Sequence, residues 1–219
     1  MRNLAIGDIH GCYYTFRKLL DKINLSTNDN LYLLGDMVNR GTNSSNVLDL
    51  IIDLQKDNYN IFPIRGNHEQ LLLNLLNESP HIKHKYLRYY KSTDLFNSKD
   101  TLKKRYFKLL NDMPFYLMND NSIFVHAALD LSREDVFENK DFMLYSRYQR
   151  GSIKNLNGKR LFHGHVATNI KIIRNNVAQK EAIIGIDNGC IYAQKRKGFG
   201  RLICINTDNL EVISVKNIE

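Results

Sequence analysis

Three short apolar runs in the first third of the chain each end at a glycine and are each followed by a helical pattern. The runs are residues 3–6, 31–34 and 61–64, and the glycines that follow them are Gly7, Gly35 and Gly66. Apolar runs of this length, bounded by glycine, are typical of buried strands. Strands that alternate with helices predict parallel βαβ units with right-handed crossovers. The alternation therefore predicts an α/β fold in which the loops after these strands meet at one edge of a sheet.

The helical patterns and the later strands complete the expected architecture. We expect a helix over residues 13–23, a second after a cap at Ser44 or Ser45, and a third over residues 70–76. Further strands are expected at residues 122–125, 160–162, 182–186, 202–205 and 211–215, and the close spacing of the later ones predicts antiparallel pairing. Because no Pro- or Ser-rich linker divides the chain, we expect one mixed α/β domain over residues 1–219.

Residues 81–111 form a basic and aromatic segment with a helical pattern between the two groups of strands. Its cationic and aromatic residues are Lys83, Lys85, Arg88, Lys91, Lys103, Lys104, Arg105, Lys108, Tyr86, Tyr89, Tyr90, Tyr106 and Phe107. Such interleaving can bind nucleic acid. It is also typical of an amphipathic helical insert whose aromatic residues pack inward, and we favour that second interpretation.

The composition limits the location and the partners. Hydrophobic residues make up 43% of the chain and charged residues 25%, and no apolar run approaches the ~20 residues that span a bilayer. The amino terminus turns polar too early for a secretory signal, so we expect a cytoplasmic protein without membrane contact. Cys12, Cys190 and Cys204 contain no CxxC pair and are expected to be buried and free. A net charge of +8 favours anionic partners, among them phosphorylated protein, nucleotide and nucleic acid.

Six residues with metal-binding side chains each follow a predicted strand. Carboxylate, amide and imidazole groups suit Mn, Fe or Zn, and thiolate is absent from the set. The six are enough for two ions if one carboxylate bridges, and Asp36 is the natural bridge because it lies between the two ligand sets in chain order. The residues are Asp8, His10, Asp36, Asn67, His126 and His165. His163, which precedes the glycine of the Gly164–His165 pair, is expected to be structural.

The motifs around these residues resemble a known enzyme family. They are Gly7-Asp8-Ile9-His10-Gly11, Gly35-Asp36-Met37-Val38-Asn39-Arg40-Gly41, Arg65-Gly66-Asn67-His68-Glu69, His126-Ala127 and Gly164-His165, with a late turn at Asp187-Asn188-Gly189. In this order and spacing they resemble the phosphoprotein phosphatase branch of the calcineurin-like metallophosphoesterases, with the small lambda-type phosphatases of phages and bacteria as the closest likeness.

The resemblance implies a fold, a cofactor and roles for individual residues. It implies two packed mixed β-sheets flanked by helices, with two divalent metal ions, Mn²⁺ first and Fe or Zn as alternatives, held by loops at one edge. Asp8, His10 and Asp36 would bind the first ion, and Asp36, Asn67, His126 and His165 the second. Arg40 and Arg147 would hold the substrate phosphate, and Arg65 matches the family too, with a role either at the phosphate or in the structure. A dimetal-bound hydroxide would attack the phosphorus in line while His68 protonates the leaving group.

Asn39 departs from the family pattern. Protein phosphatases carry an aspartate here, which pairs with the catalytic histidine and raises its pKa. Asn39 can orient His68 but supplies no charge, so we expect slower turnover of leaving groups that need a proton.

The substrate class stays open between two enzymatic readings. Arg65 and Glu69 favour a serine/threonine phosphatase, with phosphotyrosine as a further substrate and phosphorylated proteins or peptides as partners. Asn39 favours a symmetrical dinucleoside polyphosphate hydrolase, whose substrates would be nucleotides or capped RNA. We favour the phosphatase because two residues, Arg65 and Glu69, support it and only Asn39 supports the dinucleoside polyphosphate hydrolase. A catalytically dead binding module is disfavoured because the ligand set and His68 are all retained.

Overall fold

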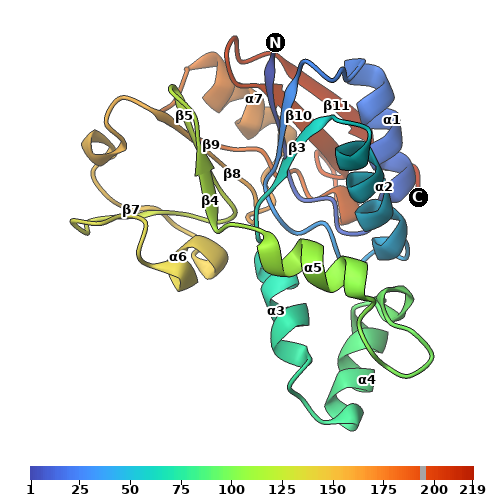
Figure 1. The fold of residues 1–219 in the computed structure, drawn as a ribbon. Helices are drawn as coiled ribbons and strands as arrows, with labels where there is room; N and C mark the ends of the chain where they lie inside the picture. Colours follow the sequence, from blue (N-terminus) through green and yellow to red (C-terminus); the bar gives the residue numbers. More distant parts are fainter. Residues whose placement is uncertain (193–195) are drawn as a thin grey trace.

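The computed structural model describes residues 1–192 and 196–219, and in that part of the chain two main β-sheets pack against each other (Figure 1). The larger sheet has the order β11-β10-β1-β2-β3, formed by Val212–Lys216, Arg201–Asn206, Asn3–Ile6, Asn30–Leu33 and Asn60–Pro63. The smaller sheet has the order β4-β5-β8-β9, formed by Tyr116–Met118, Ser122–Val125, Arg160–His163 and Ile183–Gly185. A short pair, β6 (Asp130–Leu131) and β7 (Arg150–Gly151), lies apart from both.

Alternation of side chains along the strands explains how the two sheets pack. In β1, Leu4 and Ile6 belong to the core beneath the helices, whereas Ala5 belongs to the core between the sheets. Phe124 of β5 and Phe162 of β8 reach that inter-sheet core from the opposite side. Successive residues of a strand point to opposite faces, so each sheet is apolar on both faces and is covered on both. The predicted fold of two packed mixed sheets flanked by helices is confirmed.

Seven α-helices and three short 3₁₀ helices occur in the described residues. The α-helices are α1 (Tyr13–Ile23), α2 (Ser44–Lys56), α3 (Asn67–Leu75), α4 (Pro80–Tyr89), α5 (Lys104–Asp112), α6 (Lys140–Tyr145) and α7 (Ile170–Ala178). The 3₁₀ helices are η1 (Thr93–Leu95), η2 (Ile153–Leu156) and η3 (Cys190–Tyr192). Helices α1 and α2 cover the larger sheet, while α3, α4 and α5 form a projection on one side of the molecule (Figure 1). None of the described helices has the length and apolar character needed to cross a membrane.

Several expectations match the observed elements, and others need correction. The first three strands pair in parallel, β1 with β2 and β2 with β3, as predicted. Antiparallel pairing of the later strands holds for β10 and β11 but is wrong for β8 and β9, which are parallel. Helix α7 connects β8 to β9, and such a crossover is what parallel neighbours require. The sequence analysis also missed β4, β6, β7 and α6, which are short, and the longer helix α7.

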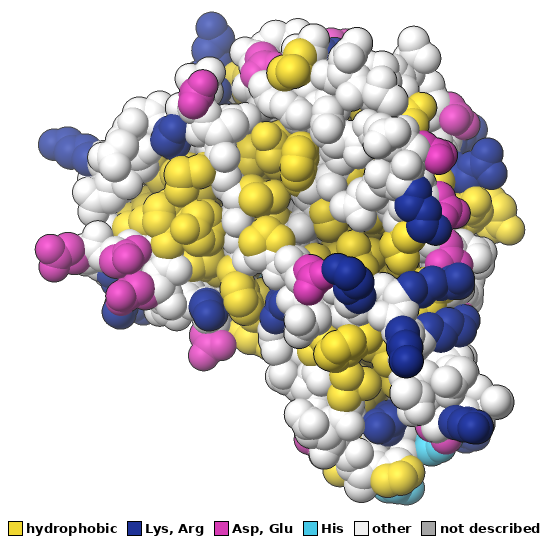
Figure 2. All heavy atoms as spheres, in the orientation of Figure 1, with side chains coloured by type: hydrophobic (Ala, Val, Ile, Leu, Met, Phe, Trp, Pro, Cys, Tyr) yellow, Lys and Arg dark blue, Asp and Glu magenta, His cyan; other side chains and the backbone are white. Residues whose placement is uncertain are grey.

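The basic and aromatic segment is not one continuous helix. Helix α4 ends at Tyr89, the chain turns with a positive φ of 56° at Lys91, and α5 starts only at Lys104. Tyr106 is fully buried, as expected of an inward-packing insert, but Tyr89 and Phe107 are exposed. Figure 2 shows Lys and Arg side chains gathered where α5 and the loop before it lie in Figure 1. The segment therefore combines a packed inner side with a basic outer side.

The cysteines are buried and free, as predicted. Cys12, Cys190 and Cys204 each lie in the core that covers the larger sheet. Burial raises the pKa of the Cys204 thiol to about 12, because the charged thiolate is poorly solvated there. A group with such a pKa stays a thiol at neutral pH and behaves as a small apolar residue.

Candidate metal centre and active site

Loops that follow five different strands meet at one edge of the two sheets. Asp8 and His10 follow β1, Asp36 follows β2, and Asn67 and His68 follow β3. From the smaller sheet, His126 follows β5 and His165 follows β8. The strands within each of these sets are parallel, so their carboxyl ends and the loops after them lie together. All six predicted ligands are thereby brought to one place.

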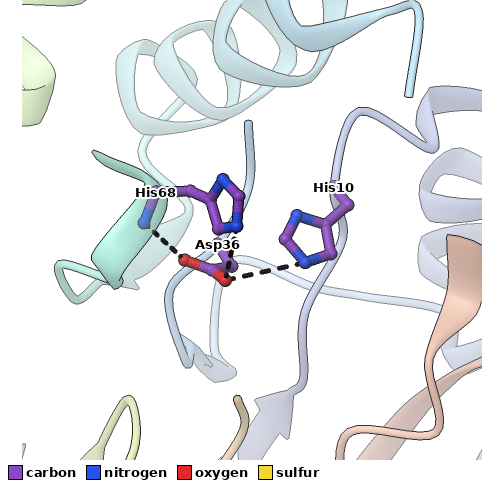
Figure 3. A group of neighbouring side chains, drawn as sticks. All are labelled: His10, Asp36 and His68. Carbon is purple, nitrogen blue, oxygen red and sulfur yellow. Dashed lines mark hydrogen bonds and ion pairs between the residues drawn. The ribbon is translucent and has the colours of Figure 1, made fainter. Parts of the chain in front are cut away.

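The first group of converging side chains centres on His10. Its Nε2 lies 3.6 Å from Asp36 Oδ2 and 3.8 Å from Asp8 Oδ2 (Figure 3 draws the Asp36 contact). Its Nδ1 lies 3.1 Å from the carbonyl oxygen of Val38, so in the neutral ring this nitrogen carries the proton. The lone pair of His10 Nε2 therefore faces two carboxylate oxygens, so three hydrogen-bond acceptors face one another. Acceptors that face one another are stabilised by a cation between them, and a histidine anchored through its other nitrogen is typical of metal ligands.

The second group repeats this arrangement around His126. Its Nδ1 donates to the carbonyl oxygen of Leu34 over 2.8 Å, which leaves Nε2 as an acceptor. This Nε2 lies 3.0 Å from Asn67 Oδ1, 3.1 Å from His165 Nδ1 and 3.5 Å from Asp36 Oδ1. Asp36 thus turns one carboxylate oxygen toward each group, as a bridging ligand does. The donor set of carboxylate, amide and imidazole fits two divalent cations.

Burial dominates the electrostatics of the site. It raises the pKa of Asp8 well above the ordinary value, and the neighbouring charges of Asp187 and Asp36 raise it further. It lowers the pKa of His10 and of His126 well below the ordinary value. A carboxylate with a raised pKa holds its proton more tightly, and a cation that binds there must displace that proton, so metal binding and proton release are coupled. Asp187, in the late turn, contributes negative charge to the cluster and was not among the predicted ligands.

Glu69 ties two of the ligand-bearing loops together. Its buried carboxylate accepts backbone N–H bonds from Asp36 and Gly66 at Oε2 (2.8 and 2.9 Å) and from Met37 and Val38 at Oε1 (2.8 and 3.2 Å). The bond to Gly66 caps α3, so the helix begins at Asn67, three residues earlier than the sequence predicted. Asn67 and His68 therefore stand on the rigid first turn of a helix. The position of Glu69, three residues after a glycine cap, was the signal for this role.

His68 is held in place by three hydrogen-bonded side chains, Asn39, Tyr86 and Ser92, which we call the bracket. Asn39 Nδ2 lies 2.9 Å from His68 Nδ1 and 3.0 Å from the hydroxyl of Tyr86. The hydroxyl of Ser92 donates to Asn39 Oδ1, so the amide oxygen is occupied and the NH₂ group faces His68. His68 Nδ1 is then an acceptor, and the proton of the neutral ring sits on Nε2. Burial lowers the pKa of His68 to about 3, with the charge of Arg40 adding to the effect, so the ring is neutral.

Two of the bracket residues could not be found from the sequence. Tyr86 and Ser92 belong to the insert, 47 and 53 residues away from Asn39 along the chain. Neither sits in a motif, and the aromatic periodicity that drew attention to Tyr86 predicted packing rather than a polar contact. His68 Nε2 lies 4.0 Å from Asp36 Oδ2, too far for a hydrogen bond, so its proton is free to reach a substrate.

The three arginines singled out from the sequence lie in different surroundings. Arg40 has a positive φ of 69°, and its N–H donates to the carbonyl oxygen of Tyr90 over 2.7 Å. Arg147 lines a pocket together with Ala127 and Val166, each of which is next in the chain to a predicted ligand. Burial lowers the pKa of His165 to about 4, with the charge of Arg147 adding to the effect. Arg65 instead bonds to Gln70 and to the carbonyl oxygen of Asn111, at the end of the insert. Both terminal nitrogens of Arg65 are engaged by the protein, and its Nε is buried without a hydrogen-bond partner among the described residues. Contacts of Arg40, Arg147 and Arg65 with a phosphate stay predictions.

The chain belongs to the calcineurin-like phosphoesterase family, whose model matches residues 1–188. The family makes the chain a hydrolase and implies divalent metal ions, for which the two groups of Asp and His side chains offer ligands.

Among curated relatives, it is similar to the symmetrical bis(5'-nucleosyl)-tetraphosphatase of Wigglesworthia glossinidia brevipalpis, 42% identical over 46% of this chain and 35% of that protein. The asymmetrical bis(5'-nucleosyl)-tetraphosphatase PrpE of Anoxybacillus flavithermus is 26% identical over 96% of this chain and 92% of its own length. The chain thus spans about a third of the first relative and nearly all of the second.

The solved structures show the shared fold. A provisionally named diadenosine tetraphosphatase superposes with a TM-score of 0.66 at 22% identity, covering 99% of this chain and 93% of its own. A serine/threonine phosphatase from Saccharomyces cerevisiae also reaches 0.66, at 18% identity, covering 100% and 81%. The preference for a protein serine/threonine phosphatase is wrong, because the curated relatives are named as tetraphosphatases. The family is confirmed, whereas the lambda-type branch is not. Arg65 and Glu69, on which that preference rested, serve structural contacts in this chain.

Proposed function

We propose that the chain hydrolyses dinucleoside polyphosphates by cleaving a phosphoanhydride bond. Asn39 is the observation that carries the proposal. A carboxylate at this position would favour the charged form of His68, whereas the amide of Asn39 supplies no charge. Burial and the charge of Arg40 then lower the pKa of His68 to about 3, so the ring is neutral. A serine alkoxide is a strongly basic leaving group and needs a proton from an effective acid. The phosphate oxygen released from an anhydride is far less basic, so a neutral imidazole N–H that donates a hydrogen bond is sufficient.

The relatives support this substrate class through their names. Symmetrical bis(5'-nucleosyl)-tetraphosphatases recur among the curated relatives, although their alignments cover only part of each protein. The asymmetrical relative matches along almost the whole chain. The shared chemistry is hydrolysis of a tetraphosphate that joins two nucleosides, and the position of cleavage is left to the experiment below.

The residues of the site take the following roles in the proposal. Asp8, His10, Asp36, Asn67, His126 and His165 would hold two divalent cations, Mn²⁺ first among the candidates. When bound, such ions neutralise phosphoryl oxygens and acidify a water molecule. Arg40 and Arg147 would orient the polyphosphate, since planar guanidinium groups match its oxygens in pairs.

The bond changes balance without a further reactant. The oxygen of water forms a bond to one phosphorus, and the bond from that phosphorus to the bridging oxygen breaks. The electron pair leaves with the departing nucleotide, whose terminal oxygen receives the hydrogen bond of His68 Nε2. The proton of the attacking water passes to solvent or to the phosphate products.

A substrate panel with Mn²⁺ tests the proposal. Diadenosine tetraphosphate, a capped RNA and a phosphoserine peptide are compared by kcat/KM, with the His68→Asn variant as the control for contaminating activity. We expect diadenosine tetraphosphate to be hydrolysed fastest. Two molecules of ADP indicate symmetrical cleavage, and ATP with AMP indicates asymmetrical cleavage. A higher kcat/KM for the phosphopeptide would overturn the proposal.

A further inference from the structure

Three tyrosines of the insert form a path of aromatic rings that leads away from His68. The ring centroid of Tyr90 lies 5.3 Å from that of His68, with the rings at 75°. Tyr89 follows at 4.8 Å from Tyr90 and at 83°, and Tyr86 packs against Tyr90 at 4.5 Å. The Tyr89 ring therefore lies no more than about 10 Å from the His68 ring. We call Tyr86, Tyr89 and Tyr90 the tyrosine ledge.

Tyr89 of the ledge is exposed, whereas Tyr86 and Tyr90 are fixed by hydrogen bonds. Tyr89 is 77% exposed, the highest value among the exposed aromatic side chains in the described residues. Its neighbour Tyr90 is held through the 2.7 Å bond from the N–H of Arg40 to its carbonyl oxygen, and Tyr86 through its bond to Asn39. An aromatic ring on a fixed support loses little conformational freedom when a ligand stacks on it. Its exposed apolar face is a candidate for such a ligand.

We infer that the tyrosine ledge binds the nucleobase of the leaving nucleotide by stacking, an inference that rests on the proposed function. His68 assigns the side of the site, because in the proposed reaction its Nε2 proton would face the oxygen of the departing group. Because the Tyr89 ring lies no more than about 10 Å from the His68 ring, a nucleotide whose terminal phosphate lies at His68 can reach the ledge with its base. Arg88 and Lys91, both exposed, flank Tyr89 in the chain and add positive charge for the polyphosphate. Every base has a π-face, so the ledge accepts nucleobases in general rather than one base.

Kinetics on substrates with and without a base test the inference. In Tyr89→Ala, the ratio of KM for diadenosine tetraphosphate to KM for inorganic tripolyphosphate should rise about tenfold, which corresponds to about 1.4 kcal/mol. Tyr89→Phe, which keeps the ring, should restore the ratio. Ile82→Ala is the matched control, because Ile82 is exposed on the same helix about two turns and roughly 10 Å away. An unchanged ratio in Tyr89→Ala would overturn the inference.

Direct binding provides a readout that does not depend on turnover. The chain contains no tryptophan, so Tyr89→Trp introduces a single fluorescent reporter. We expect AMP, but not ribose 5-phosphate, to quench this fluorescence in the metal-free protein, and we expect no quenching in Ile82→Trp. Equal quenching by both ligands, or none, would refute base stacking.

The two proposals fail in different ways. If wild-type protein does not cleave diadenosine tetraphosphate while AMP still quenches the Tyr89→Trp reporter, the proposed function fails and the ledge stands as a nucleobase site. If the substrate is cleaved but the ratio and the fluorescence do not respond, only the ledge fails.

Discussion

Replacing Glu69 by glutamine should destabilise the protein although the two side chains have nearly the same shape. Each carboxylate oxygen of Glu69 accepts two backbone N–H bonds, and the residue is fully buried. A glutamine turns one of these oxygens into an NH₂ group, so two buried N–H groups lose their acceptor and face a donor.

The magnitude follows from the number of bonds lost. An unsatisfied buried donor costs about 1–3 kcal/mol. Burial raises the pKa of Glu69, which shows that the ionised carboxylate carries a desolvation cost that the amide avoids. We therefore expect the lower part of the range, about 3 kcal/mol for two donors. For a chain of this length that lowers Tm by roughly 6–12 °C.

Thermal unfolding followed by circular dichroism measures the effect, with the metal removed by a chelator. Glu78→Gln is the matched control, because it makes the same chemical change at an exposed position of the same region. Calorimetric titration with Mn²⁺ should also show weaker binding in Glu69→Gln, since Glu69 joins the loop of Asp36 to the helix of Asn67. A Tm equal to that of Glu78→Gln would refute the reasoning.

Three further results are expected. Asn39→Asp should raise the pKa of His68 and increase kcat on phosphoserine more than on an aryl phosphate, and equal gains would argue against His68 as the acid. Ser92→Ala should lower kcat on diadenosine tetraphosphate with little change in KM, because the amide of Asn39 is no longer held toward His68; a change in KM alone would contradict the bracket. Asp29 accepts hydrogen bonds from Arg2, which lowers the pKa of Asp29 well below its ordinary value. A lowered folded-state pKa stabilises the protein above the ordinary carboxyl pKa of about 4 and ceases to do so as pH falls, so Asp29→Asn should cost stability in urea unfolding at pH 7 and progressively less toward pH 3. An Asp29→Asn effect independent of pH would count against the ion pair.

Many of the helices and strands could be predicted because their positions depend on local sequence. The bounds of α1, β1 and β5 follow from periodicity within a few residues. The convergence of the six candidate ligands follows from one rule, that loops after parallel strands meet at one edge. The parallel pairing of β8 with β9 was missed because α7, the crossover that connects them, was not recognised although Ile170, Ile173 and Val177 recur at helical spacing.

The sequence by itself determined the order of strands and loops, the metal-binding side chains after each strand and the family to which they belong. Only the tertiary structure decided which distant groups form hydrogen bonds with those side chains and with the loops that carry them. Glu69 reaches Val38 across 31 positions, and Ser92 reaches Asn39 across 53. Such contacts depend on how whole elements pack, and a hydrogen bond between distant residues leaves no periodic trace in the chain. The tyrosine ledge exists for the same reason, because packing of the insert onto the loop of Arg40 sets its rings beside His68.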